Sequence, residues 1–172
     1  MKTILHRFGP ASLRIVTILV AAILGAACGG SGPSLKVNTA PTVRFGGYKS
    51  VQIVVTAEDE KEKGKEYTGR LESQLLVKLR ERDTFQEYKL SKDEGQAELT
   101  LKAVIKDLKK SGGWGWYGRS TSKVATEVMF VENKTGATVA SIQVLAKPKY
   151  SNVETALEDA ALQIADWVRE NK

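Results

Sequence analysis

A single cysteine, Cys28, divides this chain into two parts of very different composition. The residues before it hold the only histidine, three basic residues and no acidic residue, and residues 15–23 are almost unbroken apolar sequence. A positive start, a short apolar core and small residues before a cleavage point are the three parts of an export signal. The apolar stretch is shorter than the about 20 residues that a membrane anchor takes. The sequence therefore predicts a removable signal peptide over residues 1–27, in preference to an uncleaved anchor.

Removal of that signal peptide leaves 145 of the 172 residues, with no histidine and with the only thiol at the new N-terminus. This composition excludes Ser-His-Asp and Cys-His catalysis, histidine-ligated metal sites and internal disulfides. The length suits one domain with a sizeable core. The 23 basic and 20 acidic residues that remain nearly balance, which together with export argues against nucleic-acid binding. We expect neither a metal nor a cofactor.

The five residues that end at Cys28 are Leu-Gly-Ala-Ala-Cys, residues 24–28. They resemble the bacterial lipobox, with Gly25 where a hydrophobic residue is usual and Leu24 one place earlier. The resemblance implies that the Cys28 thiol carries a diacylglyceryl group, that cleavage occurs just before it, and that the new amine is acylated. The alternative is an ordinary secretory signal in which Cys28 is an incidental thiol.

The residue after the cysteine is Gly29, and not the aspartate that retains enteric lipoproteins in the inner membrane. The resemblance therefore implies an outer-membrane lipoprotein facing the periplasm, with the outer leaflet of the cytoplasmic membrane as the alternative. Small residues follow Cys28, and no apolar periodicity occurs before about Tyr48. We expect a lipidated, flexible tether over residues 28–47 and a single periplasmic domain over residues 48–172, unless Val43 and Phe45 pair as a short edge strand.

Within residues 48–172 two kinds of apolar periodicity alternate. Leu71, Leu75 and Leu79 recur every four residues, as on one face of a helix. A second helical stripe follows a capping box made by Ser151 and Glu154. Strand patterns, with period two or with continuous apolar β-branched residues, cover residues 51–55, 85–90, 97–105, 123–132 and 137–145.

This element order predicts an α+β fold, a two-layer sandwich of a mostly antiparallel, four- to five-stranded sheet with two helices on one face. It resembles the α/β domains of periplasmic proteins such as the N-terminal domain of TolB and the curli-secretion lipoprotein. The lipobox-like segment, the long strand before residues 111–119, the strand and turn over residues 128–136 and the last helix also resemble an uncharacterised family of small bacterial envelope lipoproteins. That resemblance implies no catalytic residues.

Residues 113–118, Gly-Trp-Gly-Trp-Tyr-Gly, match the spacing of a dinucleotide-binding fingerprint. That fingerprint requires a helix N-terminus after it, where backbone amides meet the pyrophosphate, but here a strand follows. Aromatic side chains also occupy the positions that phosphate would approach. We therefore reject nucleotide binding.

The glycine-rich loop over residues 111–119 carries Trp114, Trp116, Tyr117 and Arg119. Aromatic residues beside an arginine in an exposed loop are typical of binding anchors for proteins, lipid headgroups or sugars. The alternative is that one or two of these rings cover the edge of the sheet. These four residues are the candidate binding site, with an envelope protein or a cell-wall component as the partner.

Paired carboxylates occur in the last helix, as Glu154 with Glu158 and as Glu158 with Asp159. Because the pattern implies no apolar pocket around them, a solvated helix face is favoured over acid–base chemistry. Trp167 is expected to pack in the core or at its edge. The sequence thus predicts a lipid-anchored, non-catalytic binding or assembly module, with a glycan hydrolase that lacks histidine and cysteine and acts through carboxylates as the alternative.

Overall fold

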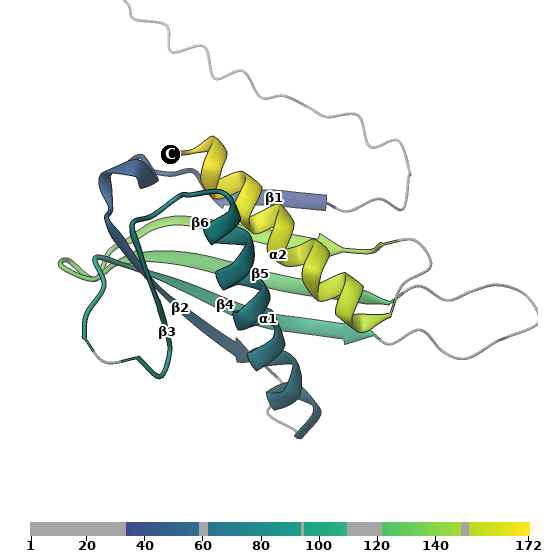
Figure 1. Ribbon diagram of the computed structural model, residues 1–172. Helices are drawn as coiled ribbons and strands as arrows, with labels where there is room; N and C mark the ends of the chain where they lie inside the picture. The colour runs from purple at the N-terminus through teal and green to yellow at the C-terminus, as the bar shows by residue number, and fades with distance from the viewer. Residues whose placement is uncertain (1–33, 59–61, 94, 110–121, 149–151) are drawn as a thin grey trace, which may run out of the picture. The chain divides into compact units, whose positions relative to one another are not determined.

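The computed structural model describes residues 34–58, 62–93, 95–109, 122–148 and 152–172 (Figure 1). Six strands, two α-helices and a short 3₁₀ helix follow one another in these ranges. In chain order they are β1 Ser34–Thr39, η1 Phe45–Gly47, β2 Ser50–Ala57, α1 Glu62–Glu81, β3 Glu87–Leu90, β4 Leu99–Lys109, β5 Lys123–Glu132, β6 Thr138–Ala146 and α2 Val153–Glu170.

The strands form one mixed sheet in the order β1-β6-β5-β4-β2-β3, and both α-helices lie on the same face of it (Figure 1). The pairs β1/β6, β6/β5 and β5/β4 are antiparallel, whereas β2 is parallel to both β4 and β3. The expected α+β class is confirmed. The sheet was expected to have four to five mostly antiparallel strands, but it has six strands and is mixed. It is mixed because α1 is a crossover that returns the chain to a parallel neighbour of β2.

The segment expected as a tether holds an edge strand and part of the core. In β1, Val37 pairs with Ile142 of β6, and the Phe45 ring of η1 is completely buried. Most β1 side chains are exposed, so this strand shows no apolar alternation in the sequence. Residues 34–47 therefore belong to the domain, and the predicted boundary at residue 48 lies too late in the chain.

The core lies between the sheet and the two helices. On α1 the leucines spaced four residues apart, Leu71, Leu75 and Leu79, are completely buried. On α2 small residues alternate with large ones, and Ala156, Ala160 and Ala161 allow that helix to pack close against β5 and β6. These helices are the ones that the four-residue periodicity predicts.

Three aromatic rings close the core beside the C-terminus. The Phe45 ring centroid lies 4.7 Å from that of Phe130 and 5.6 Å from that of Trp167, and the last two are 5.5 Å apart. Only 7% of Trp167 is exposed, so the expected packing role of this residue is confirmed. Rings from η1, β5 and α2 thus join the start, middle and end of the domain.

The N-terminal cap of α2 differs from the expected one. Asn152 is the N-cap, and its side-chain oxygen accepts a hydrogen bond of 2.9 Å from the backbone N–H of Thr155. The capping box that the sequence predicts from Ser151 places the helix start one residue too early, and the Glu154 side chain bonds to α1 instead. Ser151 and Asn152 are both short polar residues of the kind that cap a helix N-terminus, so the rule itself does not choose between them.

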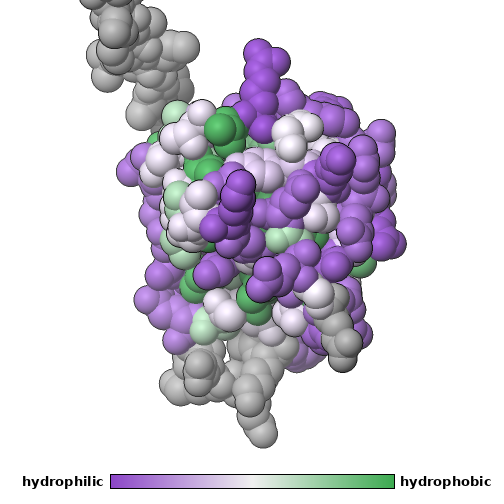
Figure 2. All heavy atoms as spheres, turned by 90° about the vertical axis from the view of Figure 1, so that its left-hand side faces the viewer, coloured by the Kyte–Doolittle hydropathy of each residue, from purple (hydrophilic) through white to green (hydrophobic). Residues whose placement is uncertain are grey.

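Hydrophilic side chains predominate on the face that bears η1 and the turn between β5 and β6 (Figure 2). Apolar residues are scattered among them on this face and do not merge into one large patch. Isolated apolar side chains of this kind are normal on a protein surface and need no partner.

Replacing Thr126 with valine is expected to raise the free energy of unfolding by about 1 kcal/mol. Thr126 is 2% exposed, and its hydroxyl has no hydrogen-bond partner among the residues that the structure describes. Valine has nearly the same shape and removes the unpaired polar group. Urea unfolding of both proteins measures the change, and a loss of stability would indicate that the hydroxyl has a partner. Thr100→Val is the control, since the Thr100 hydroxyl donates a hydrogen bond of 2.8 Å to Asn133 and its loss is destabilising.

Candidate functional site

The residues that the sequence singles out for function lie outside the described ranges: Cys28, Trp114, Trp116, Tyr117 and Arg119. The residues on either side of the 110–121 segment are described. Residues 110–121 join Lys109, the last residue of β4, to the start of β5 near Lys123. The carboxyl ends of β2, β4 and β6 and the N-termini of both helices lie at that end of the sheet, which we call the loop end (Figure 1).

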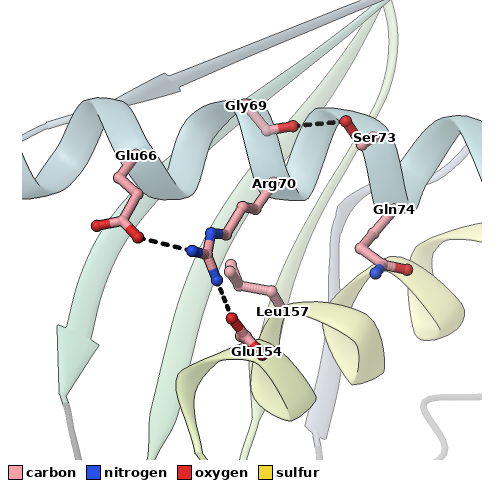
Figure 3. A pocket seen from close by; sticks show the side chains of 7 residues that line it. All are labelled: Glu66, Gly69, Arg70, Ser73, Gln74, Glu154 and Leu157. Atoms are coloured by element: carbon pink, nitrogen blue, oxygen red, sulfur yellow. Dashed lines mark hydrogen bonds and ion pairs between the residues drawn. The ribbon is translucent and has the colours of Figure 1, made fainter.

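A groove among the described residues lies between α1 and α2, close to the loop end (Figure 3). It measures about 490 Å³. A second hollow of about 380 Å³ shares Glu66, Arg70 and Glu154 with it. The groove is lined by Glu66, Gly69, Arg70, Ser73, Gln74, Glu154 and Leu157, and the hollow adds Tyr67, Ser122, Asn152 and Val153.

Arg70 is the central side chain of this groove. One of its terminal nitrogens donates a hydrogen bond of 2.8 Å to Glu66, four residues earlier on α1, and the other bonds to Glu154 at the start of α2 (Figure 3). Both prongs of the guanidinium group therefore already hold a carboxylate. An arginine paired in this way positions two helices and does not offer a free anion site.

Two further ion pairs continue the contact between the helices. Lys78 lies 3.1 Å from Glu158, and Arg82 lies 2.6 Å from Asp166. The hydrogen bond to the facing carboxylate is the main reason that the pKa of Lys78, and likewise that of Arg82, lies above its ordinary value. Arg70 and Lys78 belong to α1 and Arg82 directly follows it, so the α1 segment supplies cations to the anions of α2.

The carboxylates of α2 that the sequence groups in pairs have different partners in the structure. Glu154 and Glu158 face α1, whereas Asp159 accepts a hydrogen bond of 3.1 Å from Gln163 of its own helix. Burial raises the pKa of Asp159, and the bond from Gln163 opposes that rise. The side chains of Glu154 and Glu158 are 62% and 52% exposed, as on the expected solvated helix face, whereas Asp159 is partly buried.

A polar cluster that the sequence did not single out lies at the opposite end of the sheet. The Tyr48 hydroxyl donates to Glu132 over 3.3 Å, and the Thr135 hydroxyl donates to the other oxygen of that carboxylate over 2.6 Å. Burial, followed by the charge of Glu132, raises the pKa of Tyr48. These bonds fix the turn between β5 and β6, and each partner is a common surface residue that gives no signal in the sequence.

Two further properties concern only the residues that the structure describes. No group there of three or more histidine, cysteine, aspartate or glutamate side chains could hold a metal ion. None of the helices there is both long and apolar enough to cross a bilayer.

Among known proteins, the chain is similar in fold to several solved structures. No protein-family model and no curated protein matches the chain. The PelC dodecamer from Paraburkholderia phytofirmans matches with a TM-score of 0.62 and 12% identity, over 80% of this chain and 97% of that one. Protein XCC0632 from Xanthomonas campestris, described as DUF330, matches with a TM-score of 0.53 and 13% identity, over 81% of this chain and 91% of that one.

Structures described as bacterial lipoproteins also match. One is lipoprotein GNA1162 from Neisseria meningitidis, with a TM-score of 0.47 and 11% identity, over 71% of this chain and 99% of that one. Sequence identities this low indicate a shared fold alone, and the TM-scores of PelC and XCC0632 are the ones that support it. The domain has the fold of these two bacterial proteins.

Proposed function

We propose that this chain is a lipid-anchored, non-catalytic binding or assembly module of the bacterial envelope, attached to the membrane through Cys28. The export signal and the lipobox-like residues 24–28 support the anchor and the outer-membrane location facing the periplasm. The fold of PelC and XCC0632 supports a bacterial module of this architecture. The signal sequence is the observation that favours the envelope as the compartment.

The proposal that this module binds a partner rests on the place where residues 110–121 are attached to the sheet. They leave and re-enter the sheet at the loop end, beside the N-termini of α1 and α2. In open sheets with parallel strands, ligands bind at the carboxyl ends of those strands. Trp114, Trp116, Tyr117 and Arg119 belong to the segment that is attached to the sheet at the carboxyl ends of the parallel strands β2 and β4. The partner is an envelope protein, a cell-wall component or a further copy of this chain, since the PelC structure is a dodecamer.

The hydrolase alternative is less well supported by the described carboxylates. A glycosidase acid requires a carboxyl group that is shielded from water and has a raised pKa. Glu66 and Glu154, which line the groove, are 53% and 62% exposed at the side chain and both bond to Arg70. Neither side chain is shielded from water as a general acid has to be.

Crosslinking in native membranes tests the proposal. The double variant Trp114→Ala/Trp116→Ala is expected to lower the yield of the trapped partner at least ten-fold, because buried aromatic anchors supply most of the affinity of small interfaces. The matched control is Trp114→Phe/Trp116→Phe, which keeps an aromatic ring at both positions and should keep most of the yield. Mass spectrometry identifies the trapped species, and a second copy of the chain would favour assembly over the binding of another partner. An unchanged yield in the alanine variant would refute the role of this loop.

A further inference from the structure

Lysines gather on the face of the sheet that the helices leave uncovered. On β4, Lys102 and Lys106 alternate with the buried Leu101, Ala103 and Ile105, so they point away from the helices. The last residue of β4 and the first residue of β5, Lys109 and Lys123, pair with each other across the sheet. Lys36 pairs with Gln143 at the edge strand, and Lys147 directly follows β6. These six lysines form what we call the basic face. Lys109, Lys123 and Lys147 lie at its loop end, whereas Lys102 lies nearer the opposite end of β4.

The carboxylates on this face balance only part of that charge. Lys106 lies 3.5 Å from Glu58 and 3.4 Å from Glu127, and Lys123 lies 2.7 Å from Asp107. Lys123 is the main reason that the pKa of Asp107 is held below its ordinary value. Within the described part of the chain the other four lysines of the basic face form no ion pair: Lys36, Lys102, Lys109 and Lys147. The face therefore has a net positive charge, although the chain without its signal peptide is nearly balanced.

Apolar side chains lie between these lysines. Val104, Met129 and Leu145 alternate along their strands with residues that face the helices, and each is partly exposed. Lysine stems can cover such side chains while their ammonium groups reach outward. A flat surface that combines cations with half-exposed apolar groups is complementary to the headgroup region of a bilayer with anionic lipids.

The length of chain before β1 decides which end of the sheet can approach a membrane. Five residues lie between Cys28 and Ser34, and the six Cα–Cα steps from one to the other allow at most about 20 Å when fully extended and about 13 Å as a flexible coil. Ser34 pairs with Leu145, one residue from the loop-end terminus of β6. The turn between β5 and β6 lies about 25 Å further along the strands. A short tether at Ser34 thus holds the loop end close to the bilayer, whereas that turn can lie further from it.

We propose that the basic face binds anionic phospholipid headgroups and orients the domain with its loop end toward the membrane. The proposal rests on the lipid anchor at Cys28, which holds the domain at a high effective concentration beside the surface. Each basic residue near an anionic bilayer strengthens binding about five-fold. Three of the four unpaired lysines, Lys36, Lys109 and Lys147, together therefore favour the docked orientation about 100-fold, and this preference weakens as salt screens the surface.

Fluorescence quenching on the full lipidated chain tests this orientation. Because Cys28 carries the lipid, one new cysteine gives a single labelling site. Gln143→Cys places a fluorophore on the basic face, and Val77→Cys places it on the exposed side of α1, where Val77 is 47% exposed. The vesicles contain phosphatidylcholine, with or without phosphatidylglycerol, and a lipid that carries a nitroxide quencher on its headgroup. We expect quenching at residue 143 to exceed that at residue 77 several-fold in the anionic vesicles only.

The triple variant Lys36→Gln/Lys109→Gln/Lys147→Gln should abolish that difference. The matched control is Lys49→Gln/Lys92→Gln/Lys134→Gln, which removes the same charge from exposed lysines before β2 and in the turns after β3 and β5 and should preserve the difference. Equal quenching at residues 143 and 77 on anionic vesicles, or an effect of the control variant as large as that of the triple variant, would overturn the docking proposal. A chain that does not enter vesicles at all would instead refute the lipid anchor, so the two failures are distinguishable.

Discussion

The Phe45→Ala variant is expected to lose about 3–5 kcal/mol of the free energy of unfolding. The Phe45 side chain is completely buried, and its ring contacts Phe130 and Trp167. Removing it leaves a cavity between η1, β5 and α2, where no neighbouring side chain is free to collapse into the space. Equilibrium unfolding in urea, followed by tryptophan fluorescence and circular dichroism, measures the loss.

Val43→Ala is the matched control for that experiment. Val43 lies two residues before Phe45, but 45% of it is exposed, so its truncation should change the stability by no more than about 0.5 kcal/mol. If the two variants unfolded at the same urea concentration, the segment before β2 would contribute little to the fold. A large difference between them would identify residues 34–47 as part of the domain in solution.

The second large effect is expected from Cys28→Ala. This change removes the acceptor of the lipid, so the chain should move from the membrane fraction to the soluble or unprocessed fraction almost completely. Each buried methylene of an acyl chain contributes about 0.8 kcal/mol, and two or more chains hold a protein on a bilayer stably. Fractionation of cells, followed by intact-mass measurement, detects both the shift and the missing acyl mass.

Ser31→Ala is the control for the cysteine variant, because it changes a small residue of the same segment and leaves the lipid acceptor in place. It should remain in the membrane fraction with its acyl chains. Were the Cys28→Ala protein processed and membrane-bound like the control, the lipoprotein proposal would fail. Export of a soluble wild-type chain with a free thiol would support the ordinary secretory signal instead.

Elements with strong periodicity were predictable from the sequence. The strand expected over residues 123–132 has those bounds in the structure, and the leucines of α1 and the alanine-rich stripe of α2 lie in the core. In each case the buried side chains of one element repeat at the period of that element, so the pattern is local and strong.

Features that depend on distant partners were not predictable. Strand β1 exposes most of its side chains and is held by backbone pairing to β6, about one hundred residues later. The parallel pairing of β2 with β3 and β4 follows from where α1 returns the chain, which periodicity does not encode. The contact of Arg70 with Glu154 likewise joins residues 84 positions apart. The sequence can name such residues only after the topology is known.

The parallel direction of β2 and β6 has an electrostatic consequence. Each of these strands is followed by a helix on the same face of the sheet, so α1 and α2 run in the same direction. Their helix dipoles are therefore parallel, with both positive ends at the loop end. Aligned neighbouring dipoles repel each other, and the partial positive charges of both N-termini add at the loop end. The three ion pairs between the helices offset that repulsion. The backbone itself thus makes one end of this domain more positive than its side chains alone would.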